Sequence, residues 1–203
     1  LGKEDVDLLY KASANPEQYK NPDIGGGSQE AINFVEDCVK LCFFERFNER
    51  QIAYILATVE FETNGTMKPV AKKSNSTDKY YARGYIPLAG YRAYADLTLY
   101  FRSINLETNP DLALQPDIAL KILVKTFRDG SLTGVKLNNH IDHYRSDYIN
   151  ARNCIKMYDR ENANKIAKLV DKYLNIVPKF ISDEDRKLVA AYYYFPINKP
   201  WRS

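Results

Sequence analysis

The sequence is poor in the residues that build metal centres and disulfide frameworks. Its 203 residues include three cysteines, two histidines and one tryptophan. Cys38 and Cys42 lie four residues apart on an expected helix, where they could share a metal ion or pack in a core, and the lack of further ligands nearby favours packing. His140 and His143 could chelate a metal from one helix face, but without a third ligand two surface histidines are the favoured interpretation. We therefore predict no disulfide framework, no metal site and no cofactor.

Long apolar runs and a strong net charge are also missing. The apolar runs are too short to span a membrane. The net charge of +3 is too weak to indicate nucleic acid binding, although it suits a polyanionic surface such as a bacterial wall. The contents of 45% hydrophobic and 27% charged residues are typical of a globular domain. No N-terminal signal segment is recognisable in the sequence, which starts at Leu1, so the sequence does not indicate where the protein acts.

The stretch 48–65 predicts a central helix around which the chain is organised. Asn48 is a favourable N-cap, and Gln51 three residues later completes a capping-box pattern. Asn64 and Gly65 should end the helix. One face should be buried, because apolar residues recur there at helical spacing, namely Ile52, Ile55, Leu56 and Val59.

Continuing this apolar stripe leads to Glu62, in the last helical turn. Desolvation there would favour the protonated carboxylic acid, which is the form that a general acid needs near neutral pH. The alternative is that Glu62 tips into solvent at a frayed helix end. Glu60 lies on the other side of the helix and is expected at the surface.

Further helices are expected on both sides of this one. By spacing and caps they cover 4–12, 29–44 after the N-cap Ser28, 94–103, 117–128, 137–142, 148–157, 161–176 and 182–194. Residues 66–94 lose the helical period, and 79–88 is typical of a short hairpin or strand pair. We therefore predict an all-α fold, a helical bundle around a central helix with one small irregular or β-containing lobe rich in tyrosine.

Five segments occur in an order and at a spacing that are typical of one enzyme family. They read AYILATVEFETNGTMKPV, YYARGYIPLAGYRAY, NPDLALQPDIALKI, SLTGVKL and DYINAR. Together they resemble glycoside hydrolase family 19, and more narrowly the phage and bacterial endolysin branch of these chitinase-like enzymes in the lysozyme superfamily. The resemblance covers about 51–170. It implies a lysozyme-like domain, α+β at most, over 1–177, followed by a helical and aromatic C-terminal extension over 178–203.

The resemblance also implies roles for individual residues. Glu62, in Phe61-Glu62-Thr63, corresponds to the general acid that protonates the glycosidic oxygen. The segment 82–89 corresponds to one wall of a sugar groove. The residues expected to bind substrate are Thr63, Tyr81, Arg83, Tyr85 and Asp142, although some of the tyrosines could instead belong to the core. Arg152 is expected to form an ion pair with the Glu62 helix rather than to touch substrate.

The sequence departs from the family at the second catalytic position. The family's second carboxylate corresponds to Ala71 and Lys72 here, and the hydroxyl that helps to hold the attacking water corresponds to Ala89. An inverting glycosidase needs a base as well as an acid. Asp78, in the same loop, is the best remaining candidate for that base. Neighbouring lysines give the loop a positive edge that could meet the carboxylates of peptidoglycan or simply be solvated.

The leading functional interpretation is hydrolysis of β-1,4-linked N-acetylhexosamine polymers of a cell wall, with peptidoglycan favoured over chitin. The expected partner is thus a polysaccharide. A catalytically degenerate family member that binds a glycan or a protein within a larger assembly is the alternative. A third interpretation is a structural piece of a delivery particle that docks a protein partner through the aromatic tail 192–201.

Overall fold

The computed structural model describes residues 24–73 and 78–194, with side chains through 191. The expected helix at 4–12 and most of the aromatic tail lie outside the described residues. The described part is mostly helical with one small antiparallel sheet, so the predicted all-α fold with a small β-containing lobe is confirmed. Its elements are η2 (Gly25–Gly27), α2 (Gln29–Phe44), α3 (Glu49–Glu62), β1 (Val70–Lys72), β2 (Ala82–Gly84), α4 (Tyr91–Phe101), η3 (Pro110–Leu114), α5 (Pro116–Asp129), η4 (Leu137–Asn139), η5 (Asn150–Cys154), α6 (Arg160–Ile176), η6 (Val177–Phe180) and α7 (Asp183–Tyr194).

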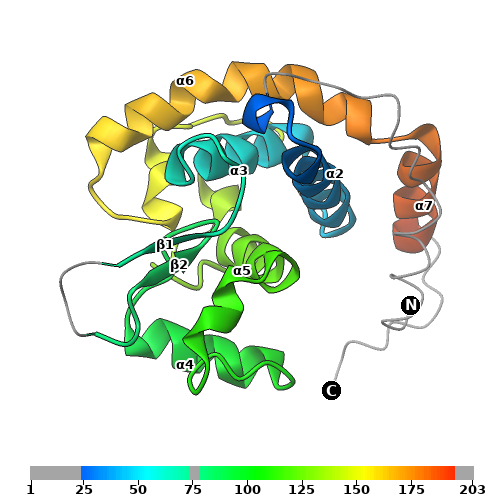
Figure 1. The fold of residues 1–203 in the computed structure, drawn as a ribbon. Coiled ribbons are helices and arrows are strands. Elements are labelled where there is room, and N and C mark those ends of the chain that lie inside the picture. The colour runs from blue at the N-terminus through cyan, green and yellow to red at the C-terminus, as the bar shows by residue number, and fades with distance from the viewer. Residues whose placement is uncertain (1–23, 74–77, 195–203) are drawn as a thin grey trace.

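The central helix α3 begins with the predicted capping box. Asn48 Oδ1 accepts a hydrogen bond from the Gln51 N–H at 3.0 Å, and Gln51 Oε1 accepts one from the Asn48 N–H at 2.9 Å. The predicted buried face is confirmed, and burial extends around the helix, because every residue from Gln51 to Val59 is buried. In Figure 1, α3 lies beneath α6, beside α2 and above α5. A helix surrounded in this way needs apolar or internally bonded side chains on all sides.

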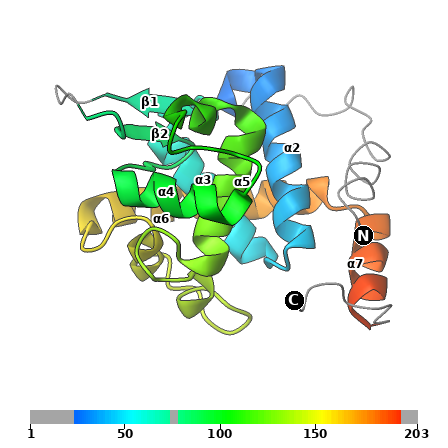
Figure 2. The same ribbon diagram turned by 90° about the horizontal axis from the view of Figure 1, so that it is seen from below.

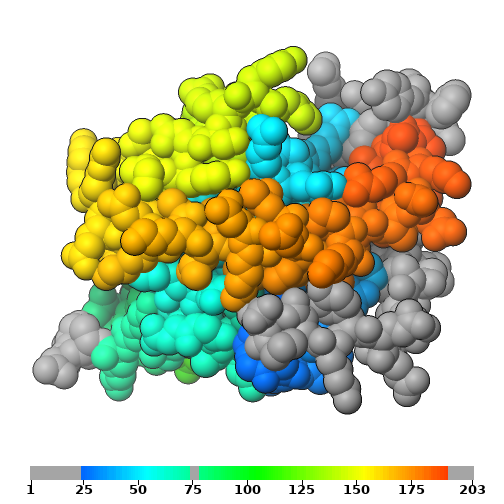
Figure 3. Space-filling view, turned by 90° about the horizontal axis from the view of Figure 1, so that it is seen from above, coloured from blue at the N-terminus to red at the C-terminus, as the bar shows by residue number. Residues whose placement is uncertain are grey.

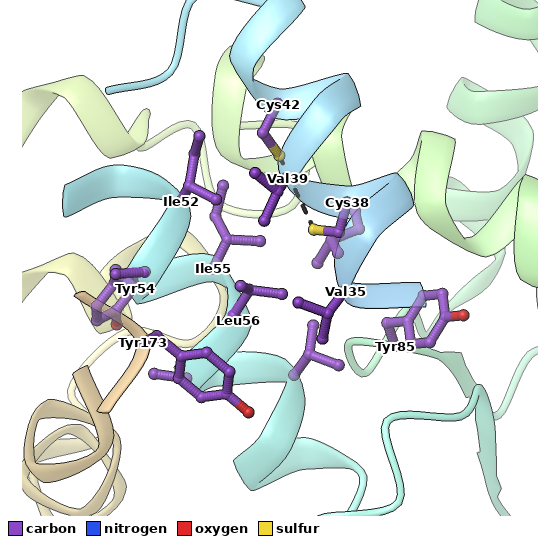
Figure 4. Close-up of a cluster of buried hydrophobic side chains, with 14 of the residues drawn as sticks. Val35, Cys38, Val39, Cys42, Ile52, Tyr54, Ile55, Leu56, Tyr85 and Tyr173 are labelled. Carbon is purple, nitrogen blue, oxygen red and sulfur yellow. Dashed lines mark hydrogen bonds between the residues drawn. The ribbon is translucent and has the colours of Figure 1, made fainter. Parts of the chain in front are cut away.

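The main core lies between α2 and α3, with a contribution from α6. Figure 4 shows Val35 and Val39 of α2 facing Ile55 and Leu56 of α3, with Tyr173 of α6 nearby. Ile55 and Val59 are fully buried, as predicted.

The thiols of Cys38 and Cys42 lie 4.0 Å apart inside this core, so the two cysteines pack there. In the described part of the chain, no group of three or more His, Cys, Asp or Glu side chains could hold a metal ion.

The small lobe is built on a two-stranded antiparallel sheet. β1 pairs with β2 so that Lys72 stands opposite Ala82 and Val70 opposite Gly84. The expectation of a hairpin within 79–88 is therefore partly wrong, since β2 pairs with a strand that the sequence analysis did not predict. Within that segment only a single bridge forms, between Arg83 and Leu88. A second, smaller hydrophobic cluster lies under α4 and includes Leu88, Tyr94, Leu97 and Ile122.

Two expected helices, 137–142 and 148–157, are instead short 3-10 turns, η4 and η5. Aspartate side chains explain the difference. Asp142 Oδ1 accepts hydrogen bonds from the N–H groups of Tyr144 and Arg145, both at 2.7 Å. Asp147 Oδ1 accepts one from the Asn150 N–H at 3.0 Å. Such local bonds from side chain to backbone compete with a continuous helix.

α6 covers the central helix, and α7 lies at the end of the molecule away from the sheet. Figure 3 shows α6 as a yellow-to-orange band across the middle of one face, and Figures 1 and 2 both show β1 and β2 at one end and α7 at the other. Ser182 and Asp185 cap α7 reciprocally, with bonds of 2.8 and 3.0 Å. The boundary at 177–178 stays a prediction. No helix in the described part is long and apolar enough to cross a membrane.

Candidate active site

The turn after α3 holds Glu62 as the last helical residue. Asn64 and Gly65 take positive φ values of 51° and 78°, and the Gly65 N–H donates to the carbonyl of Glu60 at 2.8 Å. The Thr63 hydroxyl donates to the carbonyl of Val59 at 2.8 Å and accepts from the Met67 N–H at 3.0 Å. Thr63 is 1% exposed. It therefore secures the helix end, and in this conformation its hydroxyl does not face a ligand.

The Glu62 carboxylate is buried and paired with two cations. The residue is 4% exposed, so the alternative in which it tips into solvent does not hold. Its Oε1 accepts from Arg152 Nη1 at 2.7 Å, which confirms the expected ion pair. Its Oε2 accepts from Lys72 Nζ at 2.7 Å. The carboxylate thus does not lie in the purely apolar surroundings that the stripe of residues indicated.

Arg152 is fixed from both sides. Its Nε and Nη2 donate to Asp159 Oδ2 at 2.9 and 2.8 Å. Although burial alone would raise the pKa of Asp159, hydrogen bonds from Asn162 and Arg152 hold it below its ordinary value. Two carboxylates and two cations therefore meet at the end of α3. The two cations differ in access, because the side chain of Arg152 is 4% exposed and that of Lys72 is 46% exposed.

Glu62 borders a shallow depression between the end of α3 and the small sheet. The depression contains about 150 Å³ of empty space, but this space is so narrow that no water molecule fits between its walls. A sugar ring, which is larger, does not fit either. A bound glycan would require its walls to move. It is lined by Glu62, Val70, Lys72, Ala82, Arg83, Gly84, Ile86 and Pro87. None of these residues besides Glu62 is acidic, so no second carboxylate lines the depression in the described part of the chain.

Arg83 lines this depression but directs its donors into the lobe. Its Nε donates to Asp111 Oδ1 at 2.7 Å, and its Nη1 lies within hydrogen-bonding distance of the Tyr81 carbonyl and the Tyr94 hydroxyl at 3.1 and 3.3 Å. Its guanidinium also lies 3.5 Å from the centroid of the Tyr81 ring. Tyr85 is 2% exposed and stacks on Phe34 at 4.0 Å between centroids. Tyr85 therefore packs in the core rather than on a sugar-facing wall.

Neither of the other two expected carboxylates lies at the depression. Asp78 is exposed, and its Oδ1 accepts from the Tyr80 N–H at 2.8 Å. Asp142 lines a separate open groove of about 710 Å³ together with Asn48 and Arg50. That groove is at the N-terminal end of α3, and 14 helical residues extend about 21 Å. The expectation that Asp142 shares a site with Glu62 is therefore wrong.

Two ion-pair partners were not predicted from the sequence. Asp159 was not among the predicted site residues, and its pairing depends on folding that brings it to Arg152. Glu60 was expected at the surface, but its carboxylate pairs with Lys172 of α6 at 2.7 Å and its side chain is 19% exposed. The sequence offered only the spacing of seven residues between Arg152 and Asp159, which precedes α6. Because this segment is not a continuous helix, that spacing does not predict a contact between the two side chains.

Comparison with protein-family models finds no match to this chain. Comparison with curated proteins finds no relative either.

Proposed function

We propose that this chain is a lysozyme-type glycoside hydrolase that cleaves β-1,4-linked N-acetylhexosamine polymers, with peptidoglycan preferred over chitin. Glu62 is the proton donor in this proposal. The observation that carries it is the asymmetric surroundings of one buried carboxylate at the end of the central helix. Arg152 anchors Oε1 from the interior, whereas Oε2 is contacted from the solvent side by a half-exposed lysine. The ordered resemblance to glycoside hydrolase family 19 supports the same role.

The chemistry follows from this asymmetry. A glycosidic oxygen can approach Oε2 only after Lys72 has moved away, because the ammonium group contacts that oxygen from the solvent side. Glu62 then gives its proton to the glycosidic oxygen while the bond from that oxygen to the anomeric carbon breaks. A water molecule adds to the carbon, and the proton that it releases passes to a base and returns through solvent to Glu62.

Asp78 is the proposed base. In an inverting enzyme the two carboxyl groups are roughly 6.5–9.5 Å apart, which leaves room for the attacking water. Asp78 is exposed in the turn that follows 74–77, so the proposal needs this turn to approach the depression when substrate binds. Loss of a base typically lowers the rate by about 10²–10⁴. Because Asp78 does not lie at the depression in the structure, it replaces the family's base poorly, and we therefore expect a slow enzyme.

The test is a turbidity assay on purified cell walls. We expect weak lysis by the wild type, none by Glu62→Gln and less by Asp78→Asn. Glu60→Gln is the matched control, because Glu60 lies on the same helix and is also paired with a cation, Lys172. It should keep the wild-type rate. Unchanged lysis by Glu62→Gln would refute the proposed mechanism.

A second candidate, a catalytically degenerate glycan-binding domain, is favoured by two observations. Both oxygens of Glu62 are occupied, and no second carboxylate lines the depression among the described residues. In that case wild type and Glu62→Gln would both sediment with purified walls, and neither would lower their turbidity or release reducing ends from chitin oligomers.

A further inference from the structure

The two cations on Glu62 differ in how easily they can leave. Arg152 is buried and also bound to Asp159, so removing it would leave two buried carboxylates without their partner. The Lys72 side chain is 46% exposed, whereas the Glu62 side chain that it contacts is 5% exposed, so Lys72 can move into solvent while buried Glu62 keeps its bond to Arg152. Lys72 is thus the partner that can exchange Glu62 for another anion.

The position of Lys72 suits such an exchange. It is the last residue of β1, opposite Ala82 of β2, and it forms part of the depression wall. Lys73 follows it and is exposed, with its Nζ 5.9 Å from the centroid of the Tyr81 ring. Lys73 is not part of the depression wall, so of the two lysines it is Lys72 whose ammonium group contacts the outer oxygen of Glu62 there. A neutral sugar has no anion that could pair with the Lys72 ammonium group in place of Glu62, whereas a carboxylate on the glycan can do so.

We propose that Lys72 is a specificity-determining residue that selects carboxylate-bearing glycans. A carboxylate of the ligand takes the ammonium group of Lys72 from Glu62 Oε2, so that binding the charged glycan also frees the oxygen that carries the proton. Lys72 keeps an anionic partner through the exchange and buried Glu62 keeps its bond to Arg152, so neither charge is left without a partner. On a neutral glycan Lys72 stays on Glu62 and blocks it. The inference rests on the proposed hydrolase function.

The test uses one polymer in two forms, peptidoglycan with its carboxylates intact and the same preparation with its carboxylates amidated. Wild type, Lys72→Met and Lys73→Met are compared by the initial rate at which reducing ends appear. We expect the wild type to prefer the charged form by about fivefold, the size of one exposed ion pair. Lys72→Met should cleave both forms at similar rates and should cleave the amidated form faster than the wild type does. Lys73→Met should keep the wild-type preference.

Retention of the full preference by Lys72→Met would overturn the inference while leaving the hydrolase proposal intact. If no variant cleaves either form, the hydrolase proposal fails, and the same proteins are then compared by co-sedimentation with the two polymers. There the wild type must bind the charged form more tightly and Lys72→Met must lose that difference. Equal loss in Lys73→Met, or no loss in Lys72→Met, would reject a specific role for Lys72.

Discussion

The two ends of α3 are closed by different kinds of chemistry. At the N-terminal end the closure is neutral and mostly local, since Asn48 and Gln51 satisfy each other and Gln51 Nε2 donates to the carbonyl of Ile141 at 2.7 Å. At the C-terminal end the local hydrogen bonds of Thr63 and Gly65 are joined by ion pairs of Glu62, whose cations come from ten and ninety residues further along the chain. The first kind of closure stabilises a helix. The second holds a buried carboxylate between two cations, at a cost in desolvation that neutral bonds avoid.

The largest expected effect is at the ionic end. Arg152→Met leaves the buried carboxylates of Glu62 and Asp159 without their shared partner, and it should lower the free energy of unfolding by about 3–5 kcal/mol in a denaturant titration. Arg145→Met is the matched control, because Arg145 pairs with Asp142 but its side chain is 58% exposed. That variant should lose less than about 1 kcal/mol. Equal losses in the two variants would remove the distinction drawn between buried and exposed pairs.

The middle of the helix provides the reference for packing. Ile55→Ala should cost about 2–5 kcal/mol, because Ile55 is fully buried and its truncation leaves a cavity between α2 and α3. The measurement is again a denaturant titration. Leu188→Ala on α7, where the side chain is 41% exposed, serves as control and should cost much less. A loss below about 1 kcal/mol for Ile55→Ala would mean that the core tolerates the cavity by collapsing.

Asp159→Asn weakens the ionic end without removing Arg152 and should cost about 1–3 kcal/mol near pH 7. The pKa of Asp159 is lower in the folded chain than its ordinary value of about 3.9. Its stabilisation is therefore fully present above that value and is lost as the pH falls through the lower folded value. The difference between wild type and variant should be constant above about pH 5 and shrink below pH 4. A difference that grows in acid would contradict this assignment.

At the neutral end the expected effect is smaller. Asn48→Ala removes the acceptor for the Gln51 N–H and should cost about 0.5–2 kcal/mol. Asn48→Asp keeps an acceptor at the N-cap and should retain most of the stability, as thermal unfolding can show. If Asn48→Ala costs as much as Arg152→Met, the two ends do not differ in the way proposed.

The smallest expected effect on stability is that of Lys72→Met, at about 0–1 kcal/mol. Buried Glu62 keeps its bond to Arg152 in this variant, and the cation that is lost, Lys72, is 46% exposed. Circular dichroism during thermal unfolding would measure it. A loss as large as that of Arg152→Met would show that Lys72 is a structural partner, which would argue against its exchange with a ligand.

Features with a local cause could be predicted from the sequence. The capping box at Asn48, the N-cap at Ser28 and the stop at Asn64 and Gly65 each depend on residues within a few positions of one another, and each is present. The helical periods that gave α2, α5 and α6 are local in the same sense. The 3-10 turns at η4 and η5 were predicted as helices because that prediction used the spacing of apolar residues. This spacing contains no information about aspartate side chains that accept hydrogen bonds from nearby N–H groups.

Only the tertiary structure decided what surrounds Glu62. The sequence by itself determined that an acidic residue ends the central helix, because periodicity and caps set the helix position. The resemblance anticipated an ion pair between Arg152 and this helix, but the sequence did not determine that Lys72 contacts the second carboxylate oxygen, or that Asp142 lies at the other end of α3. Those contacts depend on where β1 and η5 pack against the helix end. Charges separated by ten or ninety residues leave no periodic signal, so their pairing emerges only when the chain has folded.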